Sequence, residues 1–314
     1  MIWPHQAHAI RVCQEAHARP RSRVLVQFPT GAGKSEVAIR VALAYLLRPF
    51  SRVLIVVPSG AILQQFVQRL ASCTRHRIYI EKAGKRAPPA ARLIVASQNS
   101  LWDRLGQYDR ATLCLFDECH HANLDAAENL AIVDAFAHVV GLSATPWSRG
   151  CEALFVDAAR VSLPLSDAQA QGFVSPLSIE PWCAPEGPHS IVFCGTNAEA
   201  EAMAAAQPGA TWIGVNSGQV EARIAAWRAG RHPTIYANRM LGEGFDELRC
   251  ARVWIGVESD SDIRLMQMAG RALRSLPGKL ARIHCRSEEV MVRLERALFR
   301  AGYAPTIDPR LTPD

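Results

Sequence analysis

The sequence has no paired-cysteine motif, no long apolar run and no secretory leader, and each absence argues against a class of protein. Its nine cysteines are scattered, odd in number and never spaced C-x-x-C. This pattern argues against a disulfide framework and a structural zinc site, so we interpret them as reduced core residues. The apolar runs are too short or too interrupted to span a bilayer. Without a charged and apolar leader, we expect a cytoplasmic protein.

Size and charge allow a broad range of functions. A chain of 314 residues exceeds the usual size of one domain, which favours two. Its 49% hydrophobic and 20% charged residues are ordinary for full-sized cores. The net charge of +6 permits a polyanionic partner without establishing one.

Short apolar runs alternate with helical patterns along most of the chain. We expect strands at residues 24–28, 52–57, 77–80, 93–96, 112–116, 138–142, 191–194, 211–215, 234–237 and 251–257, and helices at 35–47, 62–70 and 198–206. Continuous apolar strands predict parallel sheets covered by helices on both faces. Pro164, Gly172 and Pro176 interrupt this rhythm, so we expect a first domain over 1–162, a linker over 163–176 and a second domain over 177–314.

A glycine-containing loop follows the first strand and opens a helix. In that setting backbone N–H groups converge on phosphate, helped by the helix N-terminus. Lys34 would reach the β- and γ-phosphates, and the Ser35 hydroxyl would ligate Mg²⁺. The expected nucleotide-binding residues of the loop are Thr30, Gly31, Ala32, Gly33, Lys34 and Ser35. One position departs from the generic pattern, which has glycine where Phe28 stands.

Two carboxylates follow the apolar strand 112–116. Side chains at the carboxyl end of such a strand project into the crevice where open α/β sheets bind ligands. Asp117 would hold Mg²⁺, and Glu118 would orient and deprotonate the attacking water. An acidic pair alone is more often a solvated turn, but downstream of a phosphate loop it predicts the second half of an ATPase site.

These motifs and several others occur in the order typical of superfamily 2 helicases of the D-E-x-H type. D-E-C-H stands at 117–120, S-A-T at 143–145, G-E-G-F-D at 242–246 and Q-M-A-G-R-A-L-R at 267–274. The sequence resembles that superfamily over nearly its whole length. The resemblance implies an α/β fold of two tandem RecA-like domains with parallel sheets, ATP in the cleft between them, and ATP and Mg²⁺ as cofactors.

The resemblance also implies roles for single residues on the nucleotide. Gln6 would read adenine, whereas Trp3 would either stack on the base or cap the core. Gly244 and Asp246 would approach the nucleotide and its ribose. Arg271 and Arg274, three apart, would share one helical face and act in catalysis, with Arg274 as the better arginine finger.

Other residues would couple ATP to nucleic acid. The couplers implied are His120, Ser143, Thr145 and Gln267, whereas His121 is interpreted as a mere neighbour of His120. The implied nucleic-acid contacts are Ser59, Gly60, Ser97, Gln98, Thr196 and Asn197. The basic loop 82–86, with Lys85 and Arg86, is either a further phosphate contact or a solvated surface loop.

The expected partner is DNA, either single-stranded or branched and duplex. The segment 163–176 and R-x-x-x-W-x-x-G at 223–230 resemble the XPB/RadD-like branch, many of whose members act on DNA. With only a short tail after residue 274 and no evident strand-separating wedge, the chain resembles a minimal motor of bacterial or phage origin. We expect it to be monomeric, with protein partners for targeting left open. The hypothesis is an ATP-dependent DNA helicase or translocase. The alternatives are an RNA helicase and a nucleic-acid clamp with weak ATPase activity.

Overall fold

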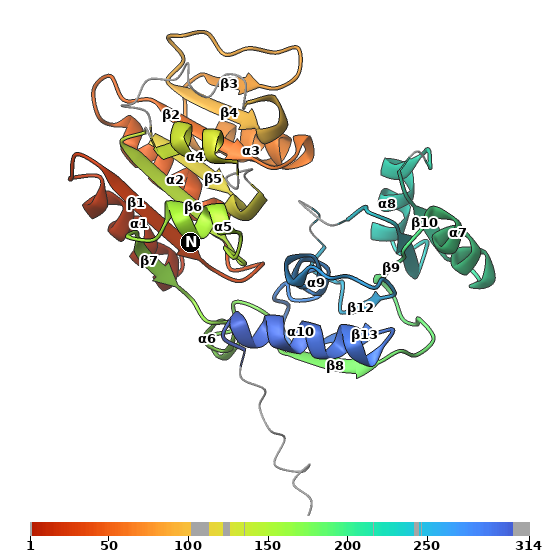
Figure 1. The fold of residues 1–314 in the computed structure, drawn as a ribbon. Helices are drawn as coiled ribbons and strands as arrows, with labels where there is room; N and C mark the ends of the chain where they lie inside the picture. The colour runs from red at the N-terminus through yellow and green to blue at the C-terminus, as the bar shows by residue number, and fades with distance from the viewer. Residues whose placement is uncertain are drawn as a thin grey trace, which may run out of the picture. The chain divides into compact units, whose positions relative to one another are not determined.

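The chain divides into two compact units (Figure 1), each considered separately below. The computed structural model describes residues 2–101, 113–121, 126–134, 136–215, 217–241, 245 and 247–303. One unit comprises Met1–Phe28 with Gly33–Leu163, and the other comprises Pro164–Asp314 with Pro29–Ala32. Across the described residues, none of the helices has the length and apolarity to cross a membrane.

The first unit is built on a seven-stranded parallel sheet. Its strands are β1 (Ser22–Gln27), β2 (Val53–Val57), β3 (Ile78–Glu81), β4 (Leu93–Ser97), β5 (Leu113–Asp117), β6 (His138–Ser143) and β7 (Ala159–Ser162). They lie in the order β3-β4-β2-β5-β6-β1-β7. β2, β4 and β5 are buried throughout, as expected for strands covered on both faces.

Helices cover the two faces of this sheet. α1 (Pro4–Ala16) packs on α2 (Lys34–Leu46), and α3 (Gly60–Cys73) packs on β4. α4 (Ala127–Asp134) and α5 (Arg149–Leu154) contribute buried side chains to an apolar cluster with strands of the sheet. Two single-turn 3₁₀ helices, η1 (Gln98–Ser100) and η3 (Cys119–His121), follow β4 and β5.

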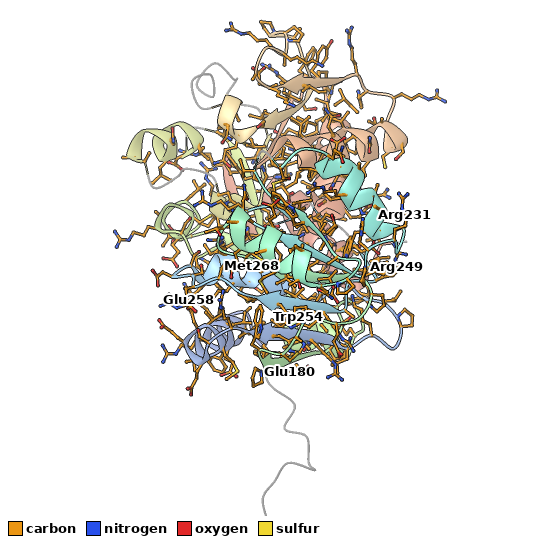
Figure 2. The ribbon with its side chains drawn as sticks, turned by 90° about the vertical axis from the view of Figure 1, so that its right-hand side faces the viewer. Glu180, Arg231, Arg249, Trp254, Glu258 and Met268 are labelled. Atoms are coloured by element: carbon orange, nitrogen blue, oxygen red, sulfur yellow. The ribbon has the colours of Figure 1, made fainter. Side chains whose placement is uncertain are left out.

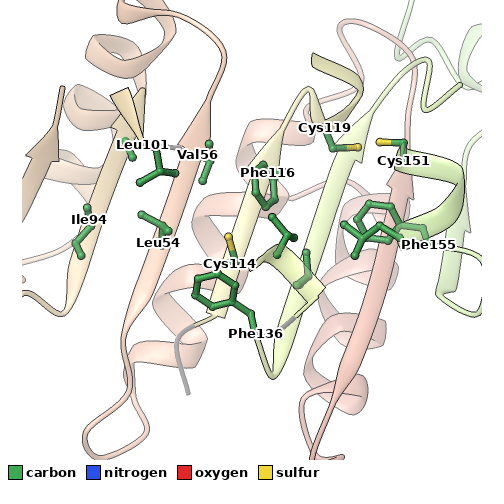
Figure 3. Close-up of a cluster of buried hydrophobic side chains, with 14 of the residues drawn as sticks. Leu54, Val56, Ile94, Leu101, Cys114, Phe116, Cys119, Phe136, Cys151 and Phe155 are labelled. Carbon is green, nitrogen blue, oxygen red and sulfur yellow. The ribbon is translucent and has the colours of Figure 1, made fainter. Parts of the chain in front are cut away.

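Figure 3 shows that apolar cluster, which holds α4 and α5 against the sheet. Leu54 and Val56 are two apart on β2, so they point to the same face. Phe116 joins them from β5, and Phe155 follows α5; both are almost fully buried. Burying a side chain of this size stabilises the fold by about 1.5–3 kcal/mol. A few such residues therefore hold these strands and helices together.

The second unit has a six-stranded parallel sheet in the order β10-β11-β9-β12-β13-β8. Its strands are β8 (Leu177–Pro181), β9 (Ser190–Phe193), β10 (Thr211–Ile213), β11 (Thr234–Ala237), β12 (Arg252–Ile255) and β13 (Ala281–Cys285). Its helices are α6 (Leu165–Ala170), α7 (Asn197–Ala206), α8 (Val220–Arg228), α9 (Asp262–Ala269) and α10 (Glu288–Arg300). α7 and α8 pack on β10 and β11, while α10 packs on α9 and β8.

The predicted α/β class with two parallel sheets of the tandem RecA-like kind is confirmed. The segment expected as a linker contains α6. The residues after 274 form β13 and α10, so the expectation of only a short tail is wrong. β13 was not expected as a strand because exposed Arg282 and the polar side chain of His284 interrupt the continuous apolar pattern of the other strands.

Candidate functional site

The predicted catalytic residues of the first unit follow three neighbouring strands. β6 lies between β5 and β1, so the carboxyl ends of these strands are adjacent. In the register, Gln27 pairs with Ser143, and Asp117 pairs with Leu142. The phosphate loop, the D-E-C-H turn and the S-A-T segment therefore begin at one edge of the sheet, where open α/β sheets bind ligands.

The phosphate loop depends on two glycines in the left-handed region. Gly31 has φ +97°, and Gly33, the N-cap of α2, has φ +81°. A Cβ at Gly33 would also lie only 2.0 Å from Nε2 of Gln6. Gly33 offers no side chain to cap the first turn of α2, which leaves the helix N-terminus suited to an anion.

Lys34 is buried at the start of α2 and joins two strand ends. Its Nζ donates to the carbonyl oxygen of Phe28 at 3.3 Å and lies 3.3 Å from Oε1 of Glu118. The ammonium group thus has its charge compensated by the carboxylate that the sequence predicts as the catalytic base. Phosphate oxygens offer the same kind of partner to this lysine.

Glu118 has a strained backbone and a stabilised charge. Its φ of +50° is rare for a residue with a side chain and is typical of functional sites. Burial raises the pKa of this carboxyl, but the charges of Lys34 and His120 lower it by more. The net pKa therefore lies below the usual value. The carboxylate therefore stays ionised, as an acceptor of a proton from water requires.

Asp117 has the opposite electrostatics. Burial, followed by the neighbouring Glu118 charge, raises its pKa to about 7. Its Oδ1 is buried and has no hydrogen-bond partner among the described residues. A buried oxygen that lacks a donor fits a hard cation such as Mg²⁺, which would restore the compensation. Ser35, half-buried in the first turn of α2, is the predicted second protein ligand.

His120 extends this network to the S-A-T segment. Its Nδ1 lies 3.6 Å from Oε2 of Glu118 and 2.7 Å from Oγ of Ser143. The same hydroxyl oxygen accepts a hydrogen bond from the backbone N–H of Thr145 at 2.9 Å. Three of the four predicted coupling residues therefore form one buried chain of polar contacts with Glu118 and Lys34.

Gln6 lies against the phosphate loop, where its side chain is buried. Its Oε1 accepts from the backbone N–H of Trp3 at 2.9 Å, and its Nε2 donates to the carbonyl oxygen of Gly33 at 3.4 Å. The amide thereby connects the start of α1 to the start of α2. Adenine recognition by Gln6 stays a prediction.

Phe28 and His5 form a contact that the sequence reasoning missed. Phe28 is fully buried, and its ring meets that of His5 edge-to-face at 4.9 Å. The ring of Trp3 lies 5.5 Å from that of His5. The aromatic residue in place of a motif glycine thus packs α1 against the loop. The only available signal was three aromatic rings flanking Gln6 and the loop.

The predicted nucleic-acid residues of the first unit differ in accessibility. Ser59 caps α3 by accepting from the backbone N–H of Ile62, and Nζ of Lys82 lies close to Gly60. Lys85 and Arg86 are exposed, and a backbone bridge pairs Lys82 with Lys85.

Ser97 and Gln98, in contrast, are buried. The Gln98 side-chain amide donates to the backbone carbonyl of His121, and the His121 ring lies 4.1 Å from that of His120. The residue interpreted as a mere neighbour therefore carries a contact from η1 to the D-E-C-H turn.

In the second unit Thr196 and Asn197 begin α7. The Thr196 side chain caps the helix by accepting from the backbone N–H of Glu199. Asn197 donates to the carbonyl oxygen of Val215 at 2.8 Å and accepts from Nδ2 of Asn238 at 3.0 Å. The two predicted contacts are thus tied to the carboxyl ends of β9, β10 and β11.

The expectation that Arg271 and Arg274 share a helical face is wrong. α9 ends at Ala269 with Gly270 as its C-cap, and Arg274 forms an isolated backbone bridge with Val174. Arg271 is buried and donates to the carbonyl oxygens of Gln267 and Phe245. After α9 the chain turns, and the bridge from Arg274 to Val174 pairs it with the segment before β8.

The remaining predictions fall in different places. Gly244 and Asp246 lie outside the described residues. Gln267 is half-buried on α9. Thr30 is half-buried and Ala32 is buried in the phosphate loop.

Residues 1–148 match the family model described as "Type III restriction enzyme, res subunit". No curated protein matches the chain. The fold is similar to that of a fragment of a putative HsdR subunit of a type I restriction enzyme from Vibrio vulnificus, with a TM-score of 0.74 and 17% identity over 95% of this chain and 66% of that one.

It is also similar to S. cerevisiae Dbp5 bound to RNA and ADP BeF3, with a TM-score of 0.65 and 14% identity over 96% of this chain and 92% of that one. At such identities the similarity establishes the fold.

Proposed function

We propose that this chain is a nucleic-acid-stimulated ATPase that moves along or remodels DNA with little sequence preference. The observation that carries the proposal is the continuous set of contacts from Lys34 through Glu118 and His120 to Ser143 and Thr145. A phosphate-binding site alone would need only Lys34 and Glu118 of this series. The extension to the S-A-T segment gives the γ-phosphate position a physical connection to residues outside the nucleotide site.

In this proposal each residue near the nucleotide has one task. Lys34 binds the β- and γ-phosphates in place of its present contact with Glu118, and Glu118 then accepts a proton from the attacking water. Ser35 and Asp117 hold Mg²⁺, which supplies positive charge to the phosphates. Gln6, Gly244 and Asp246 bind the nucleoside.

The second unit supplies the remaining charge. Arg271 and Arg274 stabilise the transferring phosphoryl group, with Arg274 as the arginine finger. Gln267 is the coupling residue of this unit. These roles rest on the motif at 267–274, and they do not require the arginines to share a helix.

Nucleic acid is held mainly through its phosphates. The candidate contacts with accessible side chains are Lys85 and Arg86, on the loop whose Lys82 lies close to Gly60 at the start of α3. DNA is favoured because the matching family model and one similar structure are both described as subunits of restriction enzymes, and restriction is an activity on DNA. RNA is the second candidate because the similar Dbp5 structure contains RNA.

The deciding experiment is ATP turnover with single-stranded DNA, duplex DNA and RNA as separate activators. We expect DNA to stimulate turnover more than RNA, and Glu118→Gln to abolish the stimulated rate while nucleotide binding persists. Stimulation by RNA alone would replace DNA with the second candidate. Turnover that is unchanged in Glu118→Gln would refute the proposed catalytic site.

A paired variant tests the nucleic-acid contacts. Changing Lys85 and Arg86 together to alanine should weaken binding and reduce the slope of log affinity against log salt by about 1–2. Arg231→Ala, which removes one charge at an exposed arginine of the second unit (Figure 2), serves as a control and should leave the slope unchanged.

A further inference from the structure

Arginines stand at the start of several strands in the sheet of the first unit. Arg21, Arg52, Arg77 and Arg92 immediately precede the first residues of β1, β2, β3 and β4, respectively. Because the paired strands of this sheet are parallel, these arginines gather at its amino-terminal edge. The phosphate loop and the D-E-C-H turn lie at the opposite edge.

Three of these arginines precede adjacent strands. β3, β4 and β2 are neighbours in the sheet (Figure 1), and the residues that follow Arg77, Arg92 and Arg52 are paired in register. Neighbouring strands are about 4.8 Å apart, so the three arginines begin close to one another. Two exposed arginines, Arg48 and Arg75, belong to the connections that enter β2 and β3. We call these five residues the arginine row.

Little negative charge faces the arginine row. In the described connections that lead into the strands of this sheet, Asp157 is the one carboxylate. Asp134, at the end of α4, pairs with Arg21. Within the part of the chain that the structure describes, the members of the row contact backbone carbonyl oxygens and tyrosine rings rather than carboxylates. Their positive charge is therefore available to an anion.

An exposed aromatic side chain stands in the same place. Phe50 belongs to the connection between α2 and β2, is 95% exposed and has a φ of +58°. The Arg92 guanidinium donates to three carbonyl oxygens of this connection and of the end of α2, those of Leu46, Arg48 and Ser51. These bonds hold the backbone on both sides of Phe50, so the ring is presented to solvent by a fixed turn.

Guanidinium groups beside an exposed ring match the chemistry of single-stranded nucleic acid. The planar fork of arginine binds phosphate oxygens, and an unpaired base stacks on an aromatic face. A duplex keeps its bases inside the helix and would use the arginines alone. A membrane surface favours a broad apolar face, whereas the α2–β2 connection exposes two large apolar side chains, Leu47 and Phe50.

We propose that the amino-terminal edge of the first sheet binds single-stranded nucleic acid, with phosphates on the arginine row and one base stacked on Phe50. This surface is separate from the contacts Ser59, Gly60, Lys85 and Arg86, which come after the carboxyl ends of β2 and β3. It goes beyond the proposed function, because it holds a strand without requiring ATP hydrolysis.

The test uses the full chain, no nucleotide, and an oligothymidine in which one base is replaced by iodouracil, a photo-crosslinker of stacked aromatic rings. We expect irradiation to crosslink the peptide that contains Phe50, with a yield about tenfold lower for the same sequence in a duplex. The yield at this peptide reports this surface alone, even when strands bind elsewhere. No crosslink at a saturating concentration, or an equal yield from the duplex, would overturn the proposal.

Variants of the arginine row test the phosphate contacts. Changing Arg75 and Arg77 together to alanine should weaken the binding measured by this crosslink and reduce the slope of log affinity against log salt by about 1.4. Changing both to lysine should retain most of the binding, which separates lost charge from a disturbed fold. The matched control changes Arg231 and Arg296, two exposed arginines of the second unit, to alanine. A row variant that behaves like this control would overturn the proposal.

Two further measurements separate this proposal from its alternatives. Glu118→Gln should abolish stimulated ATP turnover and retain the Phe50 crosslink. A chain with stimulated turnover and no such crosslink would overturn the inference drawn from this edge and leave the proposed function standing. Co-sedimentation with phosphatidylserine vesicles in the absence of the crosslink would also overturn it, and would assign the edge to a membrane surface instead.

Discussion

The contact between Gly33 and Gln6 makes a quantitative prediction about the phosphate loop. Gly33 has φ +81°, and an added Cβ would lie 2.0 Å from Nε2 of Gln6, far inside van der Waals contact. Gly33→Ala therefore meets two separate penalties. The left-handed backbone costs about 1–2 kcal/mol for a residue with a side chain, and displacing a packed neighbour costs about 1–3 kcal/mol.

The two penalties can be measured separately. Gly84→Ala in the same unit has a similar φ of +75° but open space around the new Cβ, so it should report the backbone penalty alone, about 1–2 kcal/mol. Gly33→Ala should cost about 2–5 kcal/mol. Adding Gln6→Ala removes the obstructing amide, so the double variant should be destabilised by less than the sum of the two single variants.

Urea unfolding followed by circular dichroism gives the free energy of unfolding of all four variants. The coupling between Gln6→Ala and Gly33→Ala should be about 1–3 kcal/mol in favour of the double variant, matching the packing penalty. Equal losses for Gly33→Ala and Gly84→Ala, or strict additivity in the double variant, would refute the inferred packing of Gln6 against the loop.

Three further predictions concern buried contacts of the first unit. Burial, His138 and Arg48 lower the pKa of His17 to about 3, so below about pH 6.5 the unfolded chain binds a proton that the folded chain does not. This contribution to the free energy of unfolding is fully present above that pH and is lost as the pH decreases toward 3, by about 1.4 kcal/mol per pH unit. In urea unfolding, His17→Phe should flatten this dependence on pH, and an unchanged slope would contradict the assignment to His17. Ser143→Ala removes the oxygen shared by His120 and the Thr145 N–H, so it should cost about 1–3 kcal/mol and reduce nucleic-acid-stimulated turnover more than basal turnover. The control is Ser148→Ala, which removes the N-cap side chain of α5 and should lower stability alone. Phe28→Gly restores the generic motif residue but deletes a fully buried ring; thermal denaturation should show a loss of about 3–5 kcal/mol, and a neutral effect would show that the ring does not support the loop.

The features that could be predicted from sequence are those that short segments encode. The strands at β2, β4 and β5 are continuous apolar runs because both of their faces are covered. The phosphate loop needs glycine at positive φ, and Gly31 and Gly33 supply it. In such cases the cause of the structure lies within a few residues.

Features that depend on distant segments were missed or wrong. The end of α9 at Ala269 precedes a backbone bridge between Arg274 and Val174, and that partner stands a hundred residues earlier in the sequence. A helical reading of 267–274 follows from local spacing alone and fails because the bridge determines the local backbone. The contact between Sγ of Cys183, which follows β8, and Nδ1 of His284 on β13 could not be predicted either, since the two residues come together only through the pairing of these strands.

Gln98 shows why motif position and side-chain role must be distinguished. Its place after β4 led to the expectation of a nucleic-acid contact, yet its side chain is buried and donates to the His121 carbonyl. The His121 ring in turn lies beside that of His120, which contacts Ser143. A buried amide in this position links the end of β4 to the D-E-C-H turn. In the proposed function, a strand bound near β4 would therefore act on the predicted ATPase residues through the position of this turn. We propose that Gln98 contributes to coupling through this buried hydrogen bond, which a pattern of residue types cannot reveal.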